Sequence, residues 1–303
     1  ADRFITGAAA TARNLNVSPL IIGLTIVGFG TSAPEMLVAI IAAADASPGL
    51  AVGNAIGSNI TNITLVLGVS ALIVPLHVHS RILRKELPLL LAAMLLMLLV
   101  IQDNHLGRTD GLILLTSVLL LMWWVIRQAL INKSEDPMYG EFEQELPKPM
   151  STRLALVWLV IGLTLLIISS RILVWGAIQI ATESGVSDLL IGLTIIAIGT
   201  SLPELAASIA GALKNEHDIA IGNVVGSNMF NTLAVMGIPG LIYPSTLGAG
   251  VLQRDVPVVF ILTIALVIMA FGFKGQGRIN RIEGAILFTC FVGYQVLLYF
   301  TEL

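Results

Sequence analysis

The sequence predicts an all-α integral membrane protein with ten transmembrane helices, arranged as two inverted five-helix repeats. Three observations lead to this fold class. Of the 303 residues, 56% are apolar and only 12% are charged, whereas soluble domains carry about 25% charged residues. The apolar residues form long runs with few interruptions. Finally, the two halves of the chain share motifs at one constant spacing.

The composition excludes several classes of function. A mean hydropathy of +0.92 leaves too little polar surface for a soluble enzyme of this length. The net charge of −3 offers no basic face for a nucleic acid. Cys290 is the single cysteine, which excludes an intrachain disulfide framework and a multi-cysteine metal site. We therefore expect the lipid bilayer as partner, with no nucleic acid, no obligate protein partner and no organic cofactor.

The apolar runs predict the individual spans, because a helix of about 20 apolar residues crosses a bilayer. The runs lie at 17–44, 50–74, 87–102, 109–131, 153–182, 186–213, 219–242, 255–273 and 282–301. They lack the alternation of polar and apolar residues found in outer-membrane strands, so we expect helices. Residues 1–14 are apolar but too short to span, and we expect them to end a first helix that begins before Ala1.

The longest polar stretch separates the two halves. It covers residues 132–152 and contains five acids: Glu135, Asp136, Glu141, Glu143 and Glu145. These acids do not have the ligand spacing of a helix–loop–helix calcium site, so we expect a solvated cytoplasmic linker. Residues 1–131 would then form the first inverted repeat and residues 153–303 the second.

The repeat is visible as motifs that recur 169 residues later. The motif pairs are Val17–Thr25 with Val186–Thr194, Gly30–Glu35 with Gly199–Glu204, and Gly53–Asn59 with Gly222–Asn228. A single offset without a gap indicates duplication. With five helices in each half, the odd number makes the second half enter the membrane upside down, as in the inverted repeats of secondary transporters.

Basic residues predict the orientation, because cytoplasmic loops collect Lys and Arg. Sorting the loops alternately gives one basic side: Arg13, Arg81, Arg84, Lys85, Arg127, Lys133, Lys148, Arg153, Lys214, Lys274, Arg278 and Arg281. The other side keeps Arg108 and Arg254. Both termini should therefore face away from the cytoplasm.

Two acids lie near the middle of apolar runs, at equivalent repeat positions: Glu35 and Glu204. An intramembrane charge costs roughly 3 kcal/mol on insertion scales, so such a residue usually faces a cavity and serves a function. No Lys or Arg in either motif helix is placed to neutralise them. Asp2, Arg3 and Arg171 are the other candidates for membrane depth, and we expect them to pair with each other or to extend towards the interface.

The residues around these acids supply oxygen atoms. Pro34 and Pro203 cannot donate a backbone hydrogen bond, which frees the carbonyls of Gly30 and Gly199. Polar residues also recur at helical spacings: Gly28, Thr31, Ser32 and Glu35; Asn54, Ser58 and Asn62; and Asn223, Ser227 and Asn231. A set without thiolate or imidazole suits hard cations such as Na⁺ and Ca²⁺. The simpler alternatives are interhelical hydrogen bonding and, for the Gly-x-x-x-Gly pairs, close helix packing.

The motif Gly-Thr-Ser-x-Pro-Glu followed by Gly-Asn-x-x-Gly-Ser-Asn, present twice, resembles the two alpha-repeats of the calcium/cation antiporter superfamily. The similarity is strongest to prokaryotic sodium/calcium exchangers. It implies Na⁺/Ca²⁺ antiport by alternating access in the prokaryotic plasma (inner) membrane, with Na⁺ and Ca²⁺ as transported ions. The ligands implied are the carboxylates of Glu35 and Glu204, the backbone oxygens of Gly28, Thr31, Ala197 and Thr200, and the side-chain oxygens of Ser32, Ser201, Ser58, Ser227, Asn62 and Asn231.

One position departs from part of this superfamily, and other functions stay open. Some members, including potassium-dependent ones, carry an aspartate where this chain has Asn231, so the amide argues against potassium coupling. A Ca²⁺ (or other cation)/H⁺ antiporter would use the same carboxylates, since protons compete for them. A channel would need a pore or filter loop. An intramembrane hydrolase would need an activated nucleophile, yet no histidine accompanies Ser32 or Ser201.

Overall fold

The computed structural model describes residues 2–15, 17, 30–79, 81–131, 150–271 and 277–302. Gly28, most of the expected linker and the first part of the span expected at 17–44 lie outside these residues. The first half contains α1 (Asp2–Asn14), α4 (Ala33–Ala44), α5 (Pro48–Thr61), η2 (Asn62–Val66), α6 (Leu67–Ile73), β1 (Leu76–His77), α7 (Arg81–Val100), β2 (His105–Leu106) and α8 (Arg108–Ile131).

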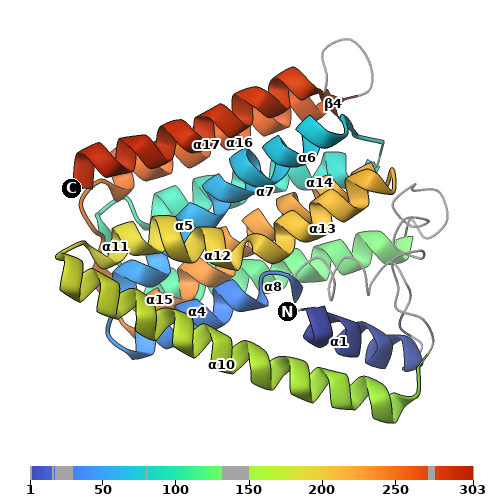
Figure 1. Ribbon diagram of the computed structural model, residues 1–303, viewed down its shortest axis with the longest axis horizontal. Helices are drawn as coiled ribbons and strands as arrows, with labels where there is room; N and C mark the ends of the chain where they lie inside the picture. The colour runs from blue at the N-terminus through green and yellow to red at the C-terminus, as the bar shows by residue number, and fades with distance from the viewer. Residues whose placement is uncertain are drawn as a thin grey trace.

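The second half repeats this order of elements. It contains α10 (Thr152–Ser184), α11 (Asp188–Ile191), η3 (Gly192–Ile196), α12 (Ala197–Thr200), α13 (Leu202–Leu213), α14 (His217–Phe230), η4 (Asn231–Val235), α15 (Met236–Ile242), β3 (Ser245–Thr246), η5 (Val251–Asp255), α16 (Val256–Phe271), β4 (Arg278–Ile279) and α17 (Arg281–Glu302). Most helices lie lengthwise in the bundle, and α10 and α17 slope in opposite senses (Figure 1).

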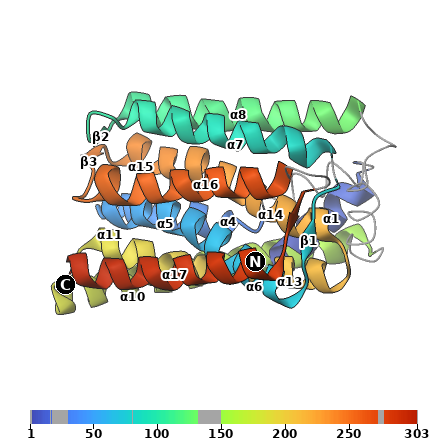
Figure 2. The same ribbon diagram turned by 90° about the horizontal axis from the view of Figure 1, so that it is seen from above.

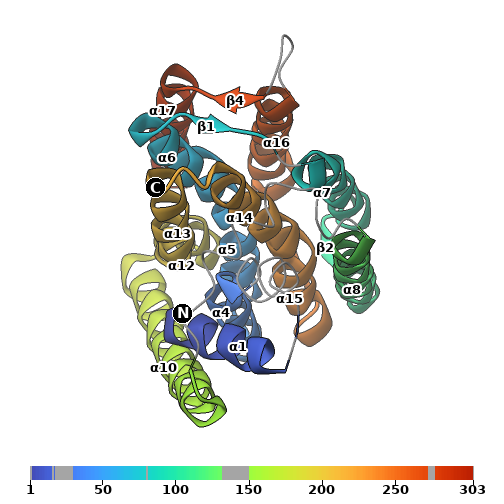
Figure 3. The same cartoon turned by 90° about the vertical axis from the view of Figure 1, so that its right-hand side faces the viewer.

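The helices form a buried inner group and an exposed outer group. The continuous helices Pro48–Ile73 and His217–Ile242 lie inside, with 78% and 94% of their most apolar stretch buried, against 22% for Thr152–Ser184. Figure 3 shows the bundle end-on, with α10 and α1 at one edge and α7 and α8 at another. The outer helices expose large apolar side chains such as Trp175 (64%) and Phe300 (78%), which suits contact with lipid rather than water.

Within the described residues, six helices are long and apolar enough to cross a membrane, and the bent pair Asp188–Thr200 and Leu202–Leu213 gives a seventh candidate span. Helix α7 has the length but carries Arg84, Lys85 and Glu86 near its start. Helix α1 has 13 residues, and the chain before Gly30 is described only in part. The prediction of ten spans therefore stays a prediction, whereas the helix positions expected from residue 50 onwards are confirmed to within a few residues, except at the start of α7.

Glycines allow close contact between helix backbones. A Cβ atom on Gly7 of α1 would clash with the backbone of Leu159 on α10, and one on Gly162 would clash with Phe4. A Cβ on Gly57 of α5 would lie 2.8 Å from Leu193 Cα in η3. The expected close packing at Gly53 and Gly57 is thus confirmed, and it is the small-residue packing typical of membrane helices.

Two short antiparallel pairs of strands connect the halves. β1 pairs with β4, with Leu76 opposite Ile279, and β2 pairs with β3, with His105 opposite Thr246. Figure 2 shows β2 and β3 together at one end of the bundle and β1 at the other. Each pair joins a loop of the first half to a loop of the second, so both ends of the bundle are held across the repeat.

Candidate ion-binding site

A turn in each Gly-Thr-Ser-x-Pro-Glu motif precedes the helix that carries the glutamate. Helix α4 begins at Ala33 after a turn at Thr31 and Ser32, and α13 begins at Leu202 after Ser201. The helix before Ser201 and the helix after it meet at 41°. Ser32 and Ser201 have nearly identical backbone angles, φ −82° and ψ 4° against φ −84° and ψ 1°. The predicted disruption at Pro34 and Pro203 is therefore confirmed.

The two glutamates sit in the first turns of these helices, fully buried. Glu35 and Glu204 are both 0% exposed, and their carboxyl groups are near enough for their charges to interact. Neither carboxylate oxygen of Glu35 has a hydrogen-bond partner. Glu204 Oε1 accepts a hydrogen bond from Ser227 at 3.3 Å, while its Oε2 has none. The positive ends of the α4 and α13 dipoles favour negative charge at both positions.

One hydrogen bond is made twice, at equivalent positions of the repeat. Thr31 Oγ1 donates to Asn223 Oδ1 at 3.1 Å, and Thr200 Oγ1 donates to Asn54 Oδ1 at 3.0 Å. Each bond joins a broken motif helix of one half to the buried helix of the other. Asn54 and Asn223 therefore position the site, although they were recognised only as members of polar stripes and not as site residues.

Other hydrogen bonds are made by residues of the first half but not by the equivalent residues of the second half. Ser32 Oγ donates to Ser227 Oγ at 2.9 Å, and Asn62 Nδ2 donates to Ser227 Oγ at 3.1 Å and to Asn228 Oδ1 at 3.0 Å. The equivalent residues in the second half, Ser201 and Asn231, are just as buried, but Ser201 Oγ and both polar atoms of Asn231 lack partners. Ser58 donates weakly to Asn54 at 3.4 Å.

The centre thus contains several buried oxygens without a hydrogen-bond partner. They are both carboxylate oxygens of Glu35, Oε2 of Glu204, Oδ1 of Asn62, Oδ1 of Asn231 and Oγ of Ser201. Buried polar atoms are nearly always satisfied in native proteins, and an unsatisfied one costs free energy. A bare cation with oxygen ligands would satisfy carboxylate, amide and hydroxyl oxygens together.

The structure describes three of the four backbone carbonyls that were expected as ligands. The carbonyl of Ala197 already accepts hydrogen bonds from Ser201 N at 3.1 Å and from Thr200 Oγ1 at 3.4 Å. Thr31 and Thr200 lie at the helix breaks, as expected. Gly28, expected to supply a fourth carbonyl, lies outside the described residues.

The other charges have partners that the sequence did not indicate. Arg171, which is 60% exposed, pairs with Asp45, which follows α4, at 2.9 Å. The Arg3 guanidinium lies 4.4 Å from the centre of the Trp158 ring. Arg254, expected in a loop, lies within η5, because the helix starts at Val251 and buries an ion pair of Arg254 with Asp255 at 2.6 Å.

Three histidines, His77, His79 and His217, lie close together. The ring of His77 lies 5.9 Å from that of His79 and 5.4 Å from that of His217. Over the described parts of the chain, no three His, Cys, Asp or Glu side chains are placed to hold a metal ion. The oxygen cluster around Glu35 and Glu204 is therefore the candidate site.

Known proteins show the same architecture and sequence pattern. A family model described as "sodium/calcium exchanger protein" matches residues 1–127 and 154–300. The chain belongs to the sodium/calcium exchanger family. It is 50% identical to a putative antiporter, CaxA, of Alkalimonas amylolytica, over 99% of this chain and 94% of that protein. It is 39% identical to the inner membrane protein YrbG of Escherichia coli, over 99% and 92%.

A solved structure agrees with these relatives. The sodium-calcium exchanger NCX_Mj, soaked with Na⁺ and Sr²⁺, superposes with a TM-score of 0.69 at 31% identity, covering 97% of this chain and 92% of that one. The chain is thus a helical integral membrane protein of an antiporter family that exchanges Na⁺ and Ca²⁺. Members of this family are transporters and not catalytic enzymes.

Proposed function

We propose that this chain exchanges Na⁺ for Ca²⁺ across the membrane by alternating access, and that Glu35 and Glu204 hold the ions near the bilayer midplane. The observation that carries the proposal is the pair of fully buried carboxylates with three unpaired oxygens between them. The family supplies the class of ion, and the buried oxygens supply a place for it.

The ligand set follows from the same cluster. Glu35 and Glu204 provide the charge, and neutral oxygens come from the serines and asparagines of the two stripes. These are Ser32, Ser201, Ser58, Ser227, Asn62 and Asn231, together with the backbone oxygens of Gly28, Thr31, Ala197 and Thr200. The set contains only oxygen, which suits Ca²⁺ and Na⁺ in preference to softer metals.

Charge balance explains why the movement would be an exchange. Two carboxylates carry a charge of −2 in a medium where Coulomb interactions are several-fold stronger than in water. One Ca²⁺ or two Na⁺ neutralise them, so the two ions compete for one place. An empty, doubly charged centre loses its hydration when it is occluded, and that cost disfavours crossing without cargo.

We also propose an inverted repeat and a specific orientation in the membrane. We expect the halves to enter the membrane in opposite directions, with both termini away from the cytoplasm. The outer pair of α1 and α10 is held together at Gly7 and Gly162 and lies at the edge of the bundle (Figure 3). These two helices would slide together over the inner group to open one side or the other.

The test is uptake of ⁴⁵Ca²⁺ by purified protein in liposomes loaded with Na⁺. We expect uptake that requires an outward Na⁺ gradient and disappears when choline replaces internal Na⁺. Uptake driven by an outward proton gradient without Na⁺ would instead establish Ca²⁺/H⁺ antiport. Glu183 lies at the exposed end of α10, so Glu183→Gln is a control that should transport normally. Normal exchange by a folded Glu35→Gln or Glu204→Gln variant would refute the proposed site.

A further inference from the structure

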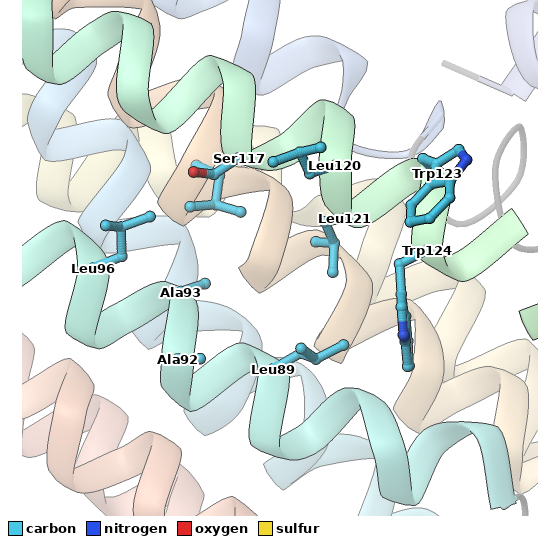
Figure 4. A pocket seen from close by; sticks show the side chains of 10 residues that line it. Leu89, Ala92, Ala93, Leu96, Ser117, Leu120, Leu121, Trp123 and Trp124 are labelled. Atoms are coloured by element: carbon cyan, nitrogen blue, oxygen red, sulfur yellow. The ribbon is translucent and has the colours of Figure 1, made fainter. Parts of the chain in front are cut away.

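A groove opens between α7 and α8 on the outer surface of the bundle. Its volume is about 450 Å³, within the range of roughly 300–1,000 Å³ typical of ligand pockets. Figure 4 shows Leu89 and Ala92 on α7 facing Leu120 and Trp124 on α8 across this space. The groove is separate from the cluster around Glu35 and Glu204.

The groove offers an occupant almost nothing polar. Its one hydroxyl, on Ser117, donates to the carbonyl of Ile113 at 2.7 Å and so needs no external partner. Two lining side chains on the outer rim, Leu120 and Trp123, are 61% and 58% exposed. On a helix that crosses the bilayer these side chains meet hydrocarbon, so the occupant must be an acyl chain.

The inner end of the groove reaches the ion-binding helix. Leu233, which is 3% exposed, lines it and belongs to η4, the π-helix that begins at Asn231. In addition, Thr232 Oγ1 in η4 contacts Met94 Sδ on α7 at 3.3 Å. An acyl chain in the groove would therefore touch the wide turn that carries one of the proposed ligands.

One end of the groove is basic. The Arg127 guanidinium lies 5.4 Å from the centre of the Trp123 ring, one turn beyond the groove. Helices α7 and α8 are consecutive and antiparallel, so the start of α7, with Arg81, Arg84 and Lys85, lies at this same end. In the described part of the chain no acidic side chain pairs with Arg127.

We propose that this groove is a binding site for an anionic phospholipid, with one acyl chain between α7 and α8 and the headgroup phosphate at Arg127. The apolar lining selects the chain, and the guanidinium selects the negative headgroup. Basic residues beside a spanning helix attract anionic lipids in this way.

The lipid is detected by quenching of the groove tryptophans. The probe is dibrominated phosphatidylglycerol, compared with dibrominated phosphatidylcholine, at equal fractions in phosphatidylcholine bilayers containing the full chain. Trp158→Phe and Trp175→Phe remove the tryptophans of α10 from the signal. We expect phosphatidylglycerol to bind about fivefold more tightly than phosphatidylcholine. This factor corresponds to the roughly 1 kcal/mol that one basic side chain near the surface contributes to anionic lipid binding.

Matched variants separate headgroup from groove. Arg127→Gln should reduce the ratio of the affinities for phosphatidylglycerol and phosphatidylcholine to about one. Arg108→Gln, at the opposite end of α8, should leave this ratio unchanged. Ala92→Phe and Ser117→Phe each fill the groove and should abolish the preference, whereas Leu119→Phe, on the exposed side of the same helix, should keep it. Folding is checked by circular dichroism.

Two results would overturn the site. Equal quenching by the two lipids in the wild-type chain excludes anionic lipid selectivity. A preference that survives both groove-filling variants but disappears in Arg127→Gln places the lipid on the surface and not in the groove. Both readouts measure binding without any transport, so they stand or fall separately from the proposed ion exchange.

Discussion

The two halves of this chain place the same side chains in the same motifs and give them different partners. In the first half, Asn62 makes two hydrogen bonds and Ser32 makes one. In the second half, Asn231 makes none and Ser201 Oγ is unpaired. Glu204 accepts a bond from Ser227, whereas Glu35 accepts none. The bonds from Thr31 to Asn223 and from Thr200 to Asn54, by contrast, are made in both halves.

The difference has a simple physical meaning. Equivalent residues can exchange partners at little net cost, because each bond lost in one half has a counterpart available in the other. In the proposed alternating-access cycle, the structure is one of two arrangements, and the second is obtained by exchanging the roles of the halves. A symmetric centre could not distinguish the two sides of the membrane.

Neutralising one glutamate in either half should have the largest effect on transport. We expect Glu35→Gln and Glu204→Gln each to lower Na⁺-dependent ⁴⁵Ca²⁺ uptake by about 100-fold or more, since removing one member of a buried charged set costs roughly 3–5 kcal/mol. Without ions, the midpoint of thermal unfolding should rise more for Glu35→Gln, because that carboxylate has no hydrogen bond. Equal midpoints for both variants would show that the glutamates are equivalent.

Cysteine pairs should trap the two arrangements. In a Cys290→Ser background, the pair Ser32→Cys with Ser227→Cys should oxidise readily, because the two Oγ atoms are 2.9 Å apart. The equivalent pair, Ser201→Cys with Ser58→Cys, should oxidise only in the other arrangement. Because the replaced serines are proposed ligands, the test measures the rate of disulfide formation by gel mobility with and without reductant, and not uptake. Simultaneous fast oxidation of both pairs would contradict an exchange of partners.

The two asparagines should differ in stability by a smaller amount. Asn62→Ala removes the bond that Asn228 Oδ1 accepts from Asn62, whereas Ser227 Oγ still accepts one from Ser32, and it should cost about 1–3 kcal/mol. Asn231→Ala removes no hydrogen bond and takes away a buried amide without partners, so it should cost less than Asn62→Ala. Thermal unfolding in ion-free detergent measures both. A similar loss for both variants would mean that Asn231 is bonded as Asn62 is.

The smallest effect concerns an ion pair at the edge of the bundle. Asp45 pairs with Arg171 at side-chain exposures of 34% and 60%, and the residues 169 positions away in sequence, Lys214 and Asp2, carry the opposite signs. Exposed pairs contribute about 0–1 kcal/mol, so Arg171→Ala should lower the free energy of unfolding by no more than this. The loss should shrink at high salt. Recovery in the double variant Asp45→Lys with Arg171→Asp would show that the charge signs are interchangeable.

The sequence was sufficient to predict the helices because a bilayer sets their length and composition. The span expected at 50–74 is the helix Pro48–Ile73, and the span expected at 153–182 is Thr152–Ser184. The breaks before Pro34 and Pro203 were also predictable, since a missing backbone N–H acts locally. The burial of Glu35 and Glu204 followed from their position in apolar runs.

What the sequence did not reveal depends on contacts between distant helices. The acceptor roles of Asn54 and Asn223 depend on which oxygen of one half faces which hydroxyl of the other. The same holds for the asymmetry between Asn62 and Asn231, because the two motifs are nearly identical in sequence. The pairing of Arg171 with Asp45 depends on where the long helix α10 crosses α4.

The π-helix η2 has a consequence for the packing beyond it. A π turn holds one more residue than an α turn, and each residue of a helix accounts for a rotation of about 100°. All residues after Val66 are thereby rotated about the helix axis. This rotation brings Gly68 against α17, where a Cβ would lie 3.0 Å from Phe288 N and 3.1 Å from the Gly284 carbonyl. If residues 62–66 formed an α turn with no residue removed, Gly68 would rotate away from α17, and the larger side chain of Leu67 would take its place at this crossing.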